Sequence, residues 1–103
     1  MLKELKSSEF ETLVKEEGKP VVLKFTAGWC RGCQQLAPVV EDVAEKMVDV
    51  VFYDIDVDNS AEFAQQYGIM SIPTLILLKK GEEVSRLTAP EPTEDTVISF
   101  AKQ

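Results

Sequence analysis

The chain has 103 residues, 45% of them hydrophobic and 28% charged, a composition typical of one soluble globular domain, so we expect a single domain over residues 1–103. Its formal net charge of −7 argues against nucleic acid and anionic membranes as partners, because both attract basic surfaces. The lack of histidine in the sequence excludes a histidine base, a cysteine–histidine nucleophile pair and histidine metal ligands.

The hydrophobic pattern alternates between strands and helices along the chain. In chain order it predicts a short strand around Leu2 and Leu5, a helix over 7–20, a strand over 21–25, a helix over 31–47, a strand over 50–57, a short helix over 61–67, strands over 74–79 and 83–88, and a final helix capped by Thr93. This alternation predicts an α/β fold in which helices cover both faces of a central sheet, with an antiparallel hairpin near its end.

Local signals define several of these elements. Ser8 and Glu11 fit a capping box at the start of the first helix. Pro38, inside the second helical pattern, should kink that helix because proline removes one backbone donor. Asn59 or Ser60 is expected to cap the short helix. The residues predicted to form the core are Phe25, Phe52, Ile55, Leu75 and Leu77.

The only cysteines of the sequence, Cys30 and Cys33, lie where a predicted strand gives way to a helix. A tetrahedral zinc site needs four ligands, so this pair completes one only if a second copy of the chain contributes. A purely structural disulfide is a weak alternative, because closing so small a loop gains little stability. Two inert buried thiols would need apolar neighbours, whereas Arg31 and Gly32 separate these two.

A chemical role fits the position of the pair better. At a helix N-terminus, unpaired amide groups and the helix dipole stabilise the thiolate of Cys30, and the charge of Arg31 adds to this effect. Cys33, one helical turn further on, is then placed to attack a mixed disulfide formed at Cys30. The pair is therefore predicted to alternate between dithiol and disulfide.

These features together resemble the thioredoxin family. The stretch WCRGC (29–33) is similar to the family's tryptophan-led CxxC motif, and SIPT (71–74) is similar to the segment that carries a cis-proline facing the cysteines. Pro38 falls where the family's active-site helix is kinked, and KKGEEV (79–84) fits its hairpin. The resemblance covers essentially the whole chain and implies a thioredoxin-like three-layer sandwich, a central mixed β-sheet with helices on both faces.

The resemblance also implies roles for individual residues. Cys30 would be the exposed nucleophile and Cys33 the buried resolving thiol, with Trp29 shielding the pair. The groove that receives a substrate disulfide would be shaped by Ile72, Pro73, Thr88 and Ala89.

The chain departs from the family pattern at the site itself. The family usually has Gly-Pro between its cysteines, where this chain has Arg31 and Gly32, and both changes should alter the reduction potential. Lys24 replaces the family's buried aspartate. We predict that Lys24 pairs with Asp54 of the neighbouring strand, with the charges of the family's pair exchanged; the alternative is that Lys24 extends its stem to solvent. Ala89 stands where the family usually has glycine.

The leading functional interpretation is a protein-disulfide reductase that carries electrons to its substrates. Cys30 attacks a substrate disulfide, Cys33 resolves the mixed disulfide, and a thioredoxin reductase drawing on NADPH restores the dithiol, as the resemblance implies. The expected partners are therefore oxidised proteins and that reductase. No bound cofactor is expected, since the chain has no glycine-rich dinucleotide loop. The alternatives are a disulfide isomerase or oxidant with a raised potential, and a non-catalytic binding module.

The sequence also bears on location. It contains no stretch with the length of a signal-peptide core or of a membrane span, so we expect a cytoplasmic protein. Nothing in the sequence requires more than one copy, so a monomer is expected, and the resemblance implies a role in cell redox homeostasis. Because net oxidation of proteins belongs to export compartments, this location favours the reductase over the oxidant.

Overall fold

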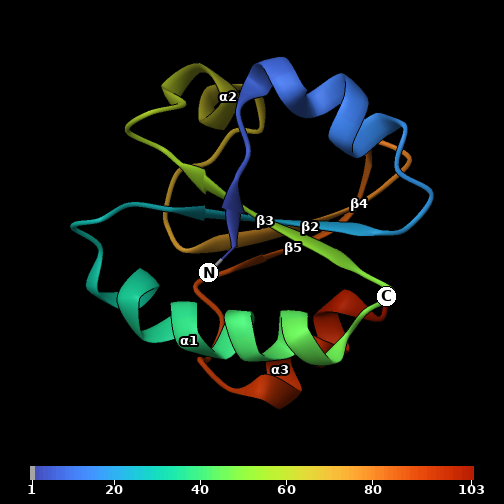
Figure 1. Cartoon of the computed structure of the whole chain (residues 1–103). Helices are drawn as coiled ribbons and strands as arrows, with labels where there is room; N and C mark the ends of the chain where they lie inside the picture. The colour runs from blue at the N-terminus through green and yellow to red at the C-terminus, as the bar shows by residue number, and fades with distance from the viewer. Residues whose placement is uncertain (1) are drawn as a thin grey trace.

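The computed structural model describes residues 2–103, and its elements alternate as predicted (Figure 1). In chain order they are β1 (Lys3–Glu4), η1 (Ser7–Glu9), η2 (Glu11–Lys15), β2 (Val21–Thr26), α1 (Arg31–Lys46), β3 (Val51–Asp56), α2 (Ala61–Gln66), β4 (Thr74–Lys79), β5 (Glu82–Thr88) and α3 (Glu94–Ala101). The strands form one sheet in the order β1-β3-β2-β4-β5. Strands β1, β3 and β2 run parallel to one another, and β4 runs antiparallel to both of its neighbours, β2 and β5, so the sheet is mixed as expected.

Helices cover both faces of this sheet. The N-terminal turns and α2 lie on one face, and α1 and α3 lie on the other (Figure 1). Each face has its own hydrophobic cluster, the first containing Phe25 and Ile55 and the second containing Phe52 and Leu75. The arrangement confirms the predicted α/β sandwich, because each apolar face of the sheet is buried beneath a helical layer.

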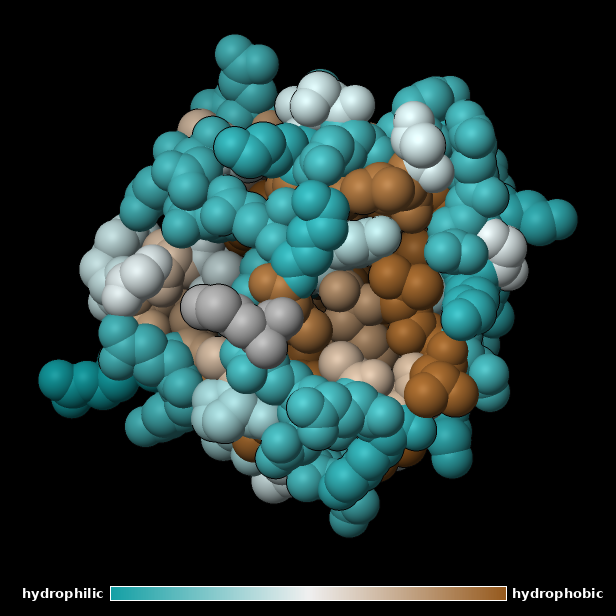
Figure 2. All heavy atoms as spheres, in the orientation of Figure 1, coloured by the Kyte–Doolittle hydropathy of each residue, from teal (hydrophilic) through white to brown (hydrophobic). Residues whose placement is uncertain are grey.

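The five predicted core residues, Phe25, Phe52, Ile55, Leu75 and Leu77, are all buried. On the face drawn in Figure 2, hydrophobic side chains gather between the two helical layers, and hydrophilic side chains surround them. The central strands β2 and β4 are each buried at five successive positions, so the core lies on both faces of the sheet, between the strands and the helices.

The first helix differs from the prediction. Residues 7–15 form a 3₁₀ turn followed by a π-helical turn. The predicted capping box of Ser8 and Glu11 is wrong, because the turn begins earlier: the amide of Lys6 donates to Glu9 Oε1 at 3.0 Å, and the amide of Glu9 donates to the Lys6 carbonyl at 2.9 Å. Val14 is nevertheless buried in the core, so the apolar stripe packs despite the irregular backbone.

The later caps and turns follow the sequence signals more closely. Thr93 Oγ1 accepts a hydrogen bond from the Thr96 amide at 3.3 Å, as predicted for the last helix. Ser60 precedes α2, but its side chain makes no capping hydrogen bond. Lys80 and Gly81 have φ angles of 54° and 83° and form the tight turn between β4 and β5, where a left-handed backbone matches the twist of the hairpin.

Candidate functional site

The two cysteines lie at the junction of β2 and α1, where α1 begins at the left of Figure 1. Cys30 is the N-cap residue of α1, and its Sγ accepts a hydrogen bond from the amide of Cys33 at 3.2 Å. The two residues form a disulfide. Cys33 is 1% exposed and Cys30 only 8% exposed, so Cys30 is less accessible than expected although it is the more open of the two. An amide donor and the helix N-terminus thus both face the sulfur of Cys30, and both stabilise negative charge there.

The loop before β4 faces this junction. The Ile72–Pro73 peptide bond is cis, as the family pattern implied, and the Ile72 carbonyl oxygen lies 3.8 Å from Cys30 Sγ. A Cβ atom added to Gly32 would lie 3.5 Å from Pro73 Cδ, which is ordinary van der Waals contact. The first turn of α1 therefore packs directly against Pro73. Arg31 lies beside it on the exposed side of the turn.

A shallow groove of about 360 Å³ adjoins Cys30 on the α2 side. Its lining residues are Trp29, Val57, Ala64, Ile69, Met70, Ser71 and Ile72. The sequence predicted only Trp29 and Ile72 from this set. Trp29 is 70% exposed, so it forms a wall of the groove more than a cover over the cysteines. Met70 is 96% exposed and was not predicted, although its position just before the SIPT segment was an available signal.

Trp29 is held by a residue that the sequence analysis missed. Its indole Nε1 donates to Asp58 Oδ2 at 2.8 Å, although the two residues are far apart in the chain. Asp58 follows β3, in a turn where Asp56 Oδ1 accepts hydrogen bonds from the amides of Asp58 and Asn59 at 2.8 and 3.2 Å. These bonds hold the backbone of Asp58, and its carboxylate in turn holds the indole ring at the edge of the groove.

Replacing Asp58 with alanine should release Trp29 with little loss of stability, because both side chains are exposed. We expect protein-disulfide reduction to slow by about two- to fivefold, the scale of one hydrogen bond of about 1 kcal/mol or less. Trp29 is the only tryptophan of the chain, so its fluorescence reports the release directly. An unchanged emission spectrum would contradict the role assigned to Asp58.

The predicted pair of Lys24 and Asp54 is present. The two residues are paired in the parallel register of β2 and β3, and Lys24 Nζ lies 3.0 Å from Asp54 Oδ1. The Lys24 side chain is 3% exposed, which excludes the alternative that it extends to solvent, while the Asp54 side chain is 21% exposed. Burial raises the pKa of Asp54, and the attraction of Lys24 offsets part of that rise.

A second cleft, of about 250 Å³, lies between this ion pair and Cys33. Lys24, Asp54 and the buried Cys33 all line it, together with Thr26, Ala27, Gly28, Gln34, Ala37, Glu41 and Asp56. Cys33 is therefore bordered on its inner side by a charged pair that solvent can reach. This shared cleft is the observation from which an electrostatic influence of the pair on Cys33 can be proposed.

Thr88 and Ala89 lie next to Pro73. Thr88 pairs with Thr74 in the hairpin register, and the amide of Ala89 donates to the Pro73 carbonyl at 2.8 Å. Ala89 has a φ angle of 48°, in the left-handed region that glycine adopts without cost. The structure thus explains why a glycine is usual here.

Replacing Ala89 with glycine should stabilise the protein by roughly 0.5–1 kcal/mol, because relief of the left-handed strain exceeds the added flexibility of the unfolded chain. Urea unfolding of the variant beside the original chain measures the difference. A lower midpoint in the variant would contradict the assignment of strain at this residue.

Within residues 2–103, no three side chains of His, Cys, Asp or Glu form a group able to hold a metal ion. Over the same residues, no helix has the length and apolar character needed to cross a membrane.

Comparison with known proteins agrees with this geometry. The family model described as Thioredoxin matches residues 1–103. A thioredoxin of Alicyclobacillus acidocaldarius is 42% identical over 98 residues, covering 94% of this chain and 92% of the relative. Thioredoxin-2 of Saccharomyces cerevisiae is 41% identical over 93 residues, covering 89% of each chain. The X-ray structure of Fasciola hepatica thioredoxin superimposes with a TM-score of 0.87 at 31% identity, covering 99% of this chain and 97% of that one.

Proposed function

The chain belongs to the thioredoxin family and is a thiol–disulfide oxidoreductase that reduces protein disulfides; within that activity, we propose that Cys30 is the nucleophile and Cys33 the resolving thiol. The observation that carries this assignment is the hydrogen bond from the Cys33 amide to Cys30 Sγ at the start of α1. A thiolate at Cys30 would keep this donor and the helix dipole, whereas a thiolate at Cys33 would lie in a nearly closed environment.

The reaction then proceeds in two exchanges. The Cys30 thiolate attacks one sulfur of the substrate disulfide, which forms a Cys30 mixed disulfide and releases the other substrate sulfur as a thiolate that takes up a proton. Cys33 then loses its proton and attacks Cys30 Sγ, which releases the second substrate thiol and forms the Cys30–Cys33 disulfide. Two electrons pass to the substrate, and the chain is left in the disulfide form described above.

The substrate segment is proposed to lie across the loop before β4. Ile72, next to a proline that has no amide hydrogen, has backbone groups available to an extended peptide, as when a strand is added to a sheet edge. Thr88 and Ala89 would form the neighbouring rim, since Ala89 is bonded to the Pro73 carbonyl. Trp29 would contact apolar side chains of the substrate beside the disulfide.

Lys24 and Asp54 are proposed to tune Cys33 through the cleft that all three line. The ammonium of Lys24 favours the Cys33 thiolate, and the carboxylate of Asp54 opposes it. As an ion pair the two present little net charge, so the potential of the couple should stay near that of a reductant. Arg31 favours the Cys30 thiolate, and Gly32 leaves the first turn of α1 without the fixed φ of a proline.

The partners that this chemistry needs are oxidised proteins and an electron source. We propose a thioredoxin reductase for the latter, by membership of the family, with the chain acting as a cytoplasmic monomer that carries electrons between the two. No cofactor need be held by the chain itself, since both electrons reside in the cysteine pair.

The test is reduction of insulin disulfides with dithiothreitol as the electron source, followed by precipitation of the free B chain. The original chain should accelerate precipitation, and the variant with Cys30 replaced by serine should match the reaction without protein. An equally active Cys30→Ser variant would refute the assignment of the nucleophile.

A further inference from the structure

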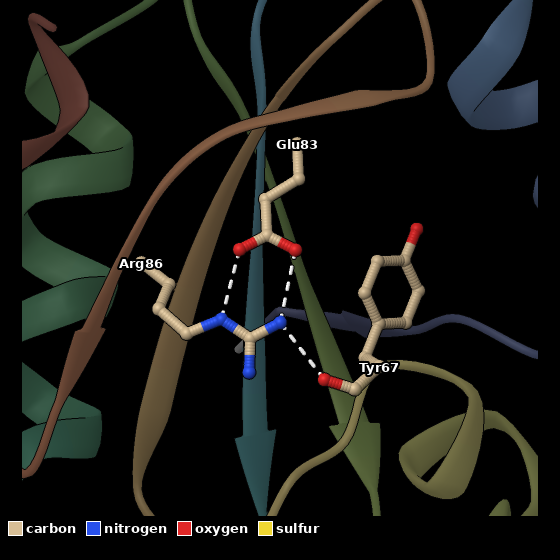
Figure 3. Close-up of polar contacts among 3 residues, drawn as sticks. All are labelled: Tyr67, Glu83 and Arg86. Carbon is tan, nitrogen blue, oxygen red and sulfur yellow. Dashed lines mark hydrogen bonds and ion pairs between the residues drawn. The ribbon is translucent and has the colours of Figure 1, made fainter.

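An ion-pair cluster on the outer hairpin reaches the loop that carries the groove (Figure 3). Arg86 Nε donates to Glu83 Oε2 at 2.8 Å, and Arg86 Nη2 donates to Glu83 Oε1 at 2.9 Å. The same Nη2 also donates to the backbone carbonyl of Tyr67 at 2.8 Å. The two-point contact with Glu83 fixes the plane of the guanidinium, which a single bond would leave free to rotate.

The backbone of β5 is shaped to bring these two side chains together. Residues three apart in a regular strand point to opposite faces. In β5, however, Leu78 pairs with Glu83 and Leu77 pairs with Ser85, so Val84 is an extra residue at a register shift. This bulge restores Glu83 and Arg86 to one face, the kind of re-aiming that bulges provide. The same contact raises the pKa of Arg86 and lowers that of Glu83.

The carbonyl that Arg86 holds belongs to the residue that ends α2. Tyr67 is the C-cap of that helix, and a carbonyl at a helix end has no partner within the helix. From Tyr67 the chain runs directly into the groove, because Ile69, Met70, Ser71 and Ile72 all line it. The segment of residues 67–73 is thus hydrogen-bonded at both ends. Arg86 donates to the carbonyl of Tyr67, and the amide of Ala89 donates to the carbonyl of Pro73.

The side chain of Tyr67 is held as well, on the side that faces the core. It packs against Phe25 and Phe63, with ring centroids 5.8 and 5.5 Å away. With the ring held in the core and the carbonyl held by Arg86, the direction in which the groove segment leaves α2 is set from both sides. Removal of the Arg86 side chain would leave the ring contacts of Tyr67 in place but would free its backbone carbonyl.

We propose that Arg86, oriented by Glu83, is a positioning residue for the substrate groove: it sets the path of residues 67–73 and thereby the binding of protein substrates, without acting on the cysteine chemistry. This inference rests on the proposed function, since it assigns the 67–73 segment to substrate binding. It names Arg86 and Glu83 as determinants of protein-substrate affinity although neither touches Cys30 or Cys33.

The test compares Arg86→Ala with Lys46→Ala in the insulin assay and with a small aromatic disulfide. Lys46→Ala removes the same charge and also breaks an ion pair, the one with Glu94, but on the α1–α3 face. For Arg86→Ala we expect the KM for insulin to rise about fivefold, the scale of one lost hydrogen bond. We expect kcat, the rate with the small disulfide and the reduction potential to stay unchanged, and Lys46→Ala to match the original chain throughout.

Glu83→Gln provides a second variant that leaves Arg86 in place but weakens its orientation, and it should raise the KM for insulin by a smaller factor. An unchanged KM in both variants, with the original chain active, would overturn the positioning role alone. A parallel loss of rate with the small disulfide would also overturn it, because the effect would then lie in the chemistry. An original chain that reduces neither disulfide would overturn the proposed function as well.

Discussion

Replacement of Cys33 with serine should trap the chain as a mixed disulfide between Cys30 and its substrate. The resolving step needs a second thiolate, and the hydroxyl of serine is not ionised at neutral pH, so turnover of a protein disulfide should fall by roughly a thousandfold or more. Both are measured on pre-reduced variant freed of dithiothreitol, which would otherwise cleave the mixed disulfide. Mass spectrometry after incubation with an oxidised protein measures the adduct, and release of the second substrate thiol measures the rate.

The matched control is Cys30→Ser, which keeps Cys33 but should form no adduct, because Cys33 is 1% exposed. The two variants differ in which sulfur remains, so the pattern of adducts identifies the nucleophile. Stable adducts on Cys33, with none on Cys30, would reverse the two roles and contradict the account of α1.

Replacement of Lys24 with methionine should lower the free energy of unfolding by about 3 kcal/mol, because it leaves a buried carboxylate without its counter-charge. Asp54 Oδ1 receives no well-oriented hydrogen bond from the described residues, so its ionised form depends on Lys24 at 3.0 Å. The Cys33 thiol pKa should rise in this variant, because the ammonium that favours its thiolate is gone. Urea unfolding and thiol titration measure the two effects.

The pH dependence of the free energy of unfolding provides a second test of the ion pair in the same variant. Burial raises the pKa of Asp54 above its usual value of 3.8, so between that value and the folded-state pKa the native protein binds more protons than the unfolded chain. The contribution of Asp54 to stability is therefore greatest below this window and falls as pH rises through it. Without Lys24 the window should extend to higher pH, so stability should fall further between acid and neutral pH.

Two controls separate the ion pair from a general effect of losing a lysine. Lys46→Met breaks the exposed pair with Glu94 and should cost far less, because solvent screens that pair. Lys24→Met combined with Asp54→Leu removes both charges and should recover most of the lost stability, as apolar replacements of buried pairs do. A Lys24→Met variant as stable as the original, with an unchanged thiol pKa, would refute the pairing and its effect on Cys33.

The layers and the cysteine junction were predictable because each depends on signals local in sequence. The apolar runs of the central strands, separated by amphipathic helices, indicated a sheet buried on both faces. The break between residues 25 and 31 placed Cys30 at a helix start. The pair of Lys24 and Asp54 was predictable for a different reason: a lysine within a buried apolar strand demands a counter-charge, and the neighbouring strand offered one. Both predictions concern large free-energy effects, namely the burial of apolar side chains and the cost of burying a charge without a partner.

The features that the sequence did not predict depend on contacts between distant segments or on small backbone differences. Asp58 contacts Trp29 only once the chain has folded and two loops lie side by side, and no local sequence pattern predicts that the two residues form a hydrogen bond. Glu83 and Arg86 share a face only because of the bulge at Val84, and a regular strand would have separated them. The cap at Lys6 and Glu9 competed with one at Ser8 and Glu11, and such alternatives differ by about 1 kcal/mol or less.

The central claim, that the Cys30–Cys33 couple is a reductant of protein disulfides, is tested most directly by its reduction potential. The protein would be equilibrated in defined dithiol and disulfide buffers, the exchange quenched with acid, and the fraction of disulfide measured by mass spectrometry. Because Lys24 and Asp54 offset each other beside Cys33, we predict a value near the thioredoxin level of about −270 mV. A value of about −200 mV or above would contradict the claim and identify the couple as an isomerase or oxidant retuned by Arg31, Gly32 and Lys24.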